Sequence, residues 1–221
     1  MENELAPTTL NELAIPDSEH DDKQFLAVTK SGDYLSRLQL MISASDACKK
    51  NDFPANHWAL IRDGNNRDVG ASVDILVIAW RPKALDISGE EVITVYDPEH
   101  DEFKRIEADS NIANSSCMYG PEFLVWVPEA GEFATFFMGS KSSRRESPNL
   151  SAKLKQPATL SSKLIETKKY SWFAPIVLDC TTPLSPLPDQ DSLAEQFNKF
   201  ENPPEPEIEK APEAAEGERE R

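Results

Sequence analysis

Residues 72–81, SVDILVIAWR, decide the fold of this 221-residue chain. The stretch is rich in β-branched residues, nearly continuous in apolar residues, and followed by Pro82. These features predict a buried β-strand that ends before the proline. We expect this strand to lie at the centre of the fold.

Several neighbouring stretches also have strand patterns. Residues 91–96 (EVITVY) alternate in polarity, as a half-buried strand does. Residues 122–127 and 132–138 flank the tetrapeptide PEAG, in which Gly131 permits a positive φ, so they predict a β-hairpin. Further strands are predicted at residues 34–43, 57–62, 158–166 and 169–178.

Helical signals are few. A short helix is predicted at residues 43–51, a single helical turn around Phe103 and Ile106 within a polar connection, and a basic loop with one turn at residues 139–150. Residues 191–200 carry apolar side chains at helical spacing, with Asp191 or Ser192 as the N-cap. Roughly seven or eight short strands and little helix predict a mainly β (β-rich α+β) protein, an antiparallel OB-like barrel or a sandwich.

Composition divides the chain into four parts. An acidic arm at 1–23 and an acidic tail at 201–221 bury too little apolar surface to fold, so both are expected to be disordered. Between them we expect a β-rich core domain at 24–180 and, at 181–200, a Pro-rich linker with the short amphipathic helix. No apolar run is long enough to span a membrane, and three cysteines are too few for a disulfide framework. We therefore expect a cytoplasmic protein, in the host cytoplasm if it is viral.

Motifs for catalysis and cofactors are not found in the sequence. It has no glycine-rich nucleotide loop and no C-x-x-C, and His20, His57 and His100 are far apart. The acidic DPEHDEF stretch around His100 is interpreted as a solvated loop, and Cys117 as a small buried hydrophobic residue. The sequence therefore predicts no enzyme, no metal and no cofactor.

Charge is distributed unevenly. The chain has 39 acidic and 23 basic residues, a net charge of −16, yet residues 140–180 have eight bases against three acids. Cations interleaved with aromatic rings are what a single-stranded nucleic-acid site needs, since the cations contact phosphates and the rings stack on bases. The predicted binding residues are Lys141, Arg144, Arg145, Lys153, Lys155, Lys163, Lys168, Lys169, Tyr170 and Trp172. The alternative is that these cations only solvate one face of a hairpin.

Within this set, the loop SKSSRR is the most suggestive segment. Small hydroxyl residues between cations allow close approach to phosphate. Arg144 and Arg145 are therefore expected to carry the anion contact from a surface loop, where replacing both by alanine would leave folding nearly unchanged.

This layout resembles that of phage-type single-stranded-DNA-binding proteins. The resemblance rests on the 24–180 body, the cations of 141–169 with Tyr170 and Trp172, and the acidic tail. It implies an OB-like barrel, a role in DNA replication or recombination, and a tail that competes with DNA and recruits partners, in a protein that could form homo-oligomers. The tail ends in ERER instead of an acidic-aromatic terminus, and most of the body is acidic.

A second reading remains open. The chain could be a viral accessory or virion-associated protein-interaction module that does not bind nucleic acid. Either reading gives the helix at 191–200 a docking role, because its apolar stripe is too small to be stable alone. That stripe packs on the body or on a partner, and its predicted partner-binding residues are Leu193, Phe197 and Phe200.

Overall fold

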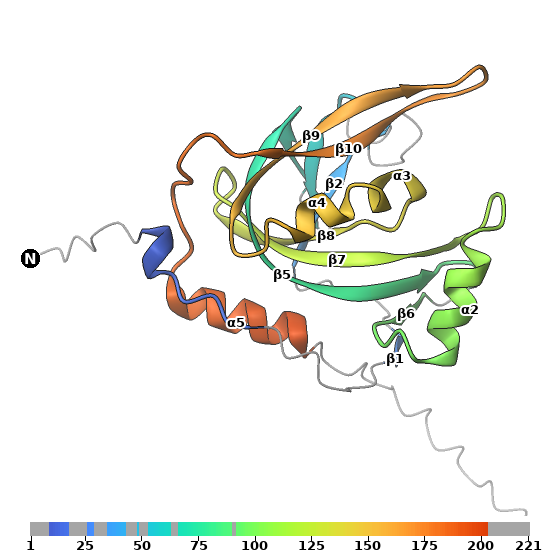
Figure 1. Cartoon of the computed structure of the whole chain (residues 1–221), viewed down its shortest axis with the longest axis horizontal. Helices are drawn as coiled ribbons and strands as arrows, with labels where there is room; N and C mark the ends of the chain where they lie inside the picture. The colour runs from blue at the N-terminus through green and yellow to red at the C-terminus, as the bar shows by residue number, and fades with distance from the viewer. Residues whose placement is uncertain are drawn as a thin grey trace, which may run out of the picture.

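The computed structural model describes residues 9–17, 26–28, 35–42, 48, 53–62, 66–89 and 92–202. This part of the chain is mainly β. It forms one ten-stranded sheet of order β1-β6-β5-β7-β8-β2-β3-β4, from which β9 and β10 branch off at β5. The sheet curls into a half-barrel (Figure 1), which confirms the predicted β-rich, barrel-like class. Only the β2–β8 pair is parallel among the described pairings.

The strands have the following bounds: β1 Leu26–Val28, β2 Ser36–Leu40, β3 Trp58–Ile61, β4 Arg67–Gly70, β5 Val73–Asp86, β6 Ile93–Val95, β7 Cys117–Val127, β8 Glu132–Phe137, β9 Pro157–Glu166 and β10 Ser171–Asp179. The helices are a 3-10 turn η1 Leu10–Glu12, then α2 Asp101–Asp109, α3 Lys141–Arg144, α4 Ser147–Ser151 and α5 Gln190–Glu201.

β5 is the centre of the sheet, as its sequence predicted. Its first residues pair with β9, its middle and end pair with β7, and its last three residues pair with β6. A register shift between Val77 and Ala79 marks the point where β5 leaves β9. One strand therefore belongs to two parts of the sheet, which explains how a single 14-residue strand organises the fold.

The prediction that this strand stops at Pro82 is wrong, because β5 runs through the proline to Asp86. Pro82 lies opposite Pro121 in the ladder with β7. Neither residue has an N–H, so the two face each other at a position where the strands exchange no hydrogen bond. On its other side Pro82 lies outside the β6 pairing, which covers only residues 84–86. The proline therefore costs β5 no backbone hydrogen bond to β7 or β6 at this position.

The β7–β8 hairpin is confirmed, with Gly131 at a φ of +68° in the turn. β7 begins five residues earlier than predicted, at Cys117. Gly120 explains part of this extension, because a Cβ there would lie 2.3 Å from the carbonyl oxygen of Met138. Only glycine allows β7 to pass this close to the chain that leaves β8.

The strands expected at 34–43, 57–62, 91–96, 158–166 and 169–178 correspond to β2, β3, β6, β9 and β10. The single turn around Phe103 and Ile106 is instead the full helix α2, which buries both side chains and has His100 as its N-cap. β4 was not predicted. The helix expected at 43–51 lies outside the described residues apart from Cys48, which is helical.

Two apolar clusters cover the two faces of the sheet. The concave face buries Trp58, Phe123, Val125 and Phe136, with Leu150 of α4 packed against them. The convex face buries Leu76, Ile78, Leu124, Trp126 and Phe133 beneath α5 (Figure 1). The N-cap of α5 is Asp189, two residues before the earlier of the two predicted caps.

Residues 9–17, part of the arm expected to be disordered, also pack on the convex face. Leu13 is buried there, and Leu10 and Ile15 pack beside it. The side chain of Gln190 accepts a hydrogen bond from the N–H of Ala14 and donates one to its carbonyl. The first described segment and the last helix therefore form one layer.

Candidate nucleic-acid interface

β9 and β10 form a long two-stranded ribbon that carries several of the predicted binding residues. The two strands pair from Ala158–Asp179 out to Glu166–Ser171, but only residues 157–160 of β9 also pair with β5. The outer half of the ribbon projects from the body (Figure 1). Its turn is closed by the Thr167 N–H, which donates to the Tyr170 carbonyl at 2.8 Å, and by the Tyr170 N–H, which donates to Thr167 Oγ1 at 3.0 Å.

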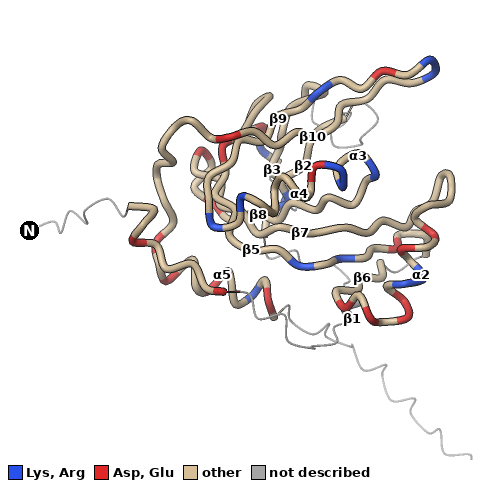
Figure 2. The backbone as a smooth tube through the Cα atoms, in the orientation of Figure 1, with Lys and Arg blue, Asp and Glu red and all other residues tan. Residues whose placement is uncertain are grey.

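The end of this ribbon combines exposed cations and exposed rings. Lys168 and Lys169 lie in the turn, where Figure 2 shows a basic tip. Tyr170 is 72% exposed and Trp172 is 37% exposed. Within the described residues, neither lysine forms an ion pair.

Strand register places more of the predicted set on the same face as Trp172. Trp172 lies opposite Ile165, and Lys163 lies opposite Ala174, so all four share one face of the ribbon. Lys163 forms an ion pair with Glu146 at 3.4 Å, which places the start of α4 beside this face. We call Lys163, Lys168, Lys169, Tyr170 and Trp172 the basic-aromatic ribbon.

Other predicted cations lie elsewhere and hold the body together. Lys153 forms an ion pair with Asp179 at the base of the ribbon. Lys155 binds Asp17 at 2.5 Å and the Ile15 carbonyl at 3.0 Å, so it fixes the N-terminal segment. Lys141 donates to the Asn111 carbonyl at 3.4 Å. The structure therefore does not gather these lysines with the ribbon tip.

The two adjacent arginines differ. Arg144 donates to the carbonyls of Tyr119 (2.8 Å) and Gly139, and its guanidinium lies 4.0 Å from the centre of the Tyr119 ring. Arg145 is exposed, with no such contact among the described residues. Arg144 is thus a cross-link between α3 and the β7 strand.

Arg144→Ala should lower the free energy of unfolding by about 2 kcal/mol, because two carbonyls lose a charged donor and the ring contact is lost. Arg145→Ala should change it by less than about 0.5 kcal/mol. Urea unfolding of the two single variants checks this. Equal stability of both variants would mean that Arg144 is only a surface cation.

A buried ionic cluster lies beneath the end of α5, and the sequence analysis missed it. Glu122 is 2% exposed and accepts hydrogen bonds from Arg81 at 2.7 and 2.9 Å and from Lys83 at 2.6 Å. Burial would raise the pKa of Glu122, but the charges and hydrogen bonds of Lys83 and Arg81 outweigh burial and lower it to about 2. The guanidinium of Arg81 also lies between the rings of Tyr96 (3.8 Å) and Phe200 (4.2 Å).

This cluster fastens the last helix to the sheet. Arg81 donates to the backbone carbonyl of Phe200, in the last turn of α5. Both oxygens of the Glu122 carboxylate accept hydrogen bonds from side chains of the same chain, so we assign the cluster a structural role. In the sequence, Arg81 and Lys83 are two residues apart and so lie on one face of a strand. This pattern predicts a shared partner such as Glu122 only if β5 continues through Pro82.

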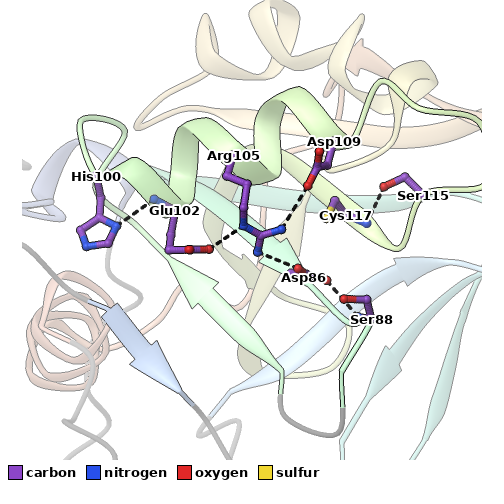
Figure 3. Close-up of polar contacts among 8 residues, drawn as sticks. All are labelled: Asp86, Ser88, His100, Glu102, Arg105, Asp109, Ser115 and Cys117. Atoms are coloured by element: carbon purple, nitrogen blue, oxygen red, sulfur yellow. Dashed lines mark hydrogen bonds and ion pairs between the residues drawn. The ribbon is translucent and has the colours of Figure 1, made fainter.

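A second polar network anchors α2 to the sheet (Figure 3). Arg105 binds Asp86 at 2.7 Å, Glu102 at 2.8 Å and Asp109 at 3.1 Å. Hydrogen bonds from Ser88 and Arg105 lower the pKa of Asp86 to about 2. Beside it, burial raises the pKa of the Cys117 thiol, so this cysteine is not activated as a nucleophile.

In the described ranges, no three His, Cys, Asp or Glu side chains gather in a way that could hold a metal ion. No helix in the same part of the chain is long and apolar enough to cross a bilayer. The two buried carboxylates, Asp86 and Glu122, are each paired with cations of the body.

The ten predicted nucleic-acid residues thus fall into two groups. The basic-aromatic ribbon and Arg145 are exposed, although Lys163 also pairs with Glu146, whereas the rest are engaged in contacts within the body. The predicted partner-binding residues Leu193, Phe197 and Phe200 are buried against the convex face. In comparisons with known proteins, the chain matches no family model, and neither a curated protein nor a solved structure is significantly similar to it.

Proposed function

We propose that the basic-aromatic ribbon binds single-stranded DNA without sequence specificity, as a cytoplasmic protein of DNA replication or recombination would. The observation that supports this most directly is the exposure of Tyr170 and Trp172 beside two lysines that have no ion-pair partner among the described residues. Lysines without an ion-pair partner in the described part of the chain are available to phosphates, and exposed rings are available to bases.

The acidic body helps to confine such binding to the ribbon. The chain has a net charge of −16, so phosphates are repelled by most of the surface and attracted at the tip. The acidic segment 203–221 has the charge to compete for the same lysines, since 19 residues can extend to roughly 65 Å. In this proposal, that tail weakens DNA binding most at low salt and recruits replication or recombination partners.

The Lys168→Ala/Lys169→Ala double variant tests the proposal. Each lost phosphate contact should reduce the slope of log affinity against log salt by about 0.7, so the double variant should lose up to about 1.4. Fluorescence anisotropy with a labelled oligonucleotide across a salt series measures this slope. Tyr170→Ala should weaken binding by about 1–3 kcal/mol, because a stacked base loses its platform.

The matched control is Lys104→Ala/Lys199→Ala. These exposed lysines of α2 and α5 pair with Glu99 and Glu195, away from the ribbon, and their loss changes the net charge equally. The control should keep the wild-type slope if the contact is local. A wild-type chain that does not bind the oligonucleotide at low salt would contradict the proposal and favour the protein-interaction reading.

A further inference from the structure

The outer edge of β10 has backbone groups that face away from its only described partner strand, β9. The Thr167 N–H donates to the Tyr170 carbonyl, so this pair is hydrogen-bonded. In an antiparallel ladder, hydrogen-bonded and non-hydrogen-bonded pairs alternate. It follows that Trp172 and Ala174 bond to β9, whereas the N–H and C=O groups of Ser171 and Phe173 point outward.

The inner part of the same edge is closed. Pro175 occupies the next outward position and has no N–H to offer. Beyond it, the backbone N–H of Val177 donates to the carboxylate of Glu146. Proline and a capping carboxylate are means by which proteins close an exposed strand edge. Among the described residues, the open section is therefore short and covers Ser171 to Phe173.

We propose that this open section pairs with the same section of a second copy of the chain, antiparallel about a two-fold axis at Trp172. Ser171 of each copy then exchanges two hydrogen bonds with Phe173 of the other, which gives four hydrogen bonds in all. The two Trp172 residues face each other as a non-hydrogen-bonded pair, the arrangement that brings side chains closest.

Charge and burial favour a second copy as the occupant. In the antiparallel arrangement, each turn with Lys168 and Lys169 lies along the base of the other ribbon, beside Glu146 and Asp179, which also pair with Lys163 and Lys153 of their own chain. The pairing also covers exposed apolar surface at Trp172, which is 37% exposed in the single chain. An isolated two-stranded ribbon is only marginally stable, and two joined ribbons make a four-stranded sheet. The pairing is made by backbone groups at the strand edges, so it requires no DNA.

Analytical ultracentrifugation of the full chain without oligonucleotide tests the pairing. The wild-type chain should show a monomer–dimer equilibrium as concentration rises. Ser171→Pro removes an outward N–H that β9 does not use, and should weaken the dimer by at least about tenfold. Ser171→Ala keeps the N–H and should dimerise like the wild type.

Two variants of opposite charge at Trp172 test whether the two-fold axis passes through this residue. Trp172→Lys alone and Trp172→Glu alone should each be monomeric, because like charges would face each other across the axis. Their mixture should restore a dimer. Circular dichroism melting confirms that each variant is folded.

A wild-type chain that stays monomeric at high concentration would overturn the inference, as would a dimer that survives both Ser171→Pro and Trp172→Lys. These outcomes are separate from the oligonucleotide titration, so failure of DNA binding leaves the pairing standing, and failure of the pairing leaves DNA binding standing.

Discussion

Replacing Glu122 by alanine should lower the free energy of unfolding by about 3–5 kcal/mol. The carboxylate is nearly inaccessible, and the side chains of Arg81 and Lys83 beside it are only 13% and 16% exposed. Removing it leaves two cations close together in a poorly solvated site, and the repulsion between them adds to the loss of three hydrogen bonds. Chemical denaturation of the two proteins at neutral pH measures the difference.

Glu166→Ala is the matched control, since this exposed carboxylate on the ribbon carries the same charge and lies away from the cluster. It should change the free energy of unfolding by less than about 0.5 kcal/mol. A Glu122→Ala protein as stable as this control would mean that Arg81 and Lys83 do not need their counter-ion.

The pH dependence of this difference has a definite sign. The folded-state pKa of Glu122 is about 2, below the value of about 4.3 for an unperturbed glutamate. The stabilisation by its charge is therefore fully present above the unfolded value and is lost as pH falls toward 2. The difference between wild type and Glu122→Ala should shrink over this range. Asp86, whose pKa is also about 2, is present in both proteins and cancels in the difference.

Phe197→Ala should lower the free energy of unfolding by about 3 kcal/mol. Phe197 is 9% exposed and lies in the convex cluster with Leu193, Phe200 and Trp126. The cavity left by its ring would open between α5 and the sheet. For a chain of this size, the loss corresponds to a melting temperature lower by roughly 6–12 °C, which differential scanning calorimetry resolves.

Lys199→Ala, on the exposed side of α5, provides the comparison. Its ion pair with Glu195 is a surface pair at i, i+4, which contributes about 0.3–0.5 kcal/mol. An unchanged melting temperature for Phe197→Ala would show that α5 is not held on the body in solution. The sequence-based assignment of its apolar stripe to a partner would then be favoured.

Local patterns predicted the strands well where apolar content and turn chemistry agreed. Residues 72–81 and the hairpin around Gly131 are examples, because both signals lie within a few neighbouring residues. The end of β5 was missed because the effect of Pro82 depends on what lies opposite it. Pro121 makes that position harmless, and the two residues are far apart in the chain.

The binding residues show the same limit. Composition identified a basic, aromatic segment, but it could not separate Lys155, which holds Asp17, from Lys168, which is exposed. Ion pairs between residues far apart in the sequence depend on the tertiary fold. Two lysines of one segment can therefore have different roles. Arg144 and Arg145 differ for this reason, although they are adjacent.

The placement of α5 has a consequence for how the chain is made. The strands that form the convex face are complete once β8 has been synthesised, but the helix that covers Leu76, Ile78 and Trp126 begins only at Gln190. A nascent chain released between these points presents an uncovered apolar surface, the kind of surface that drives aggregation and chaperone binding. We therefore expect folding to be complete only once the last helix, which is synthesised after the ribbon, has packed on this face.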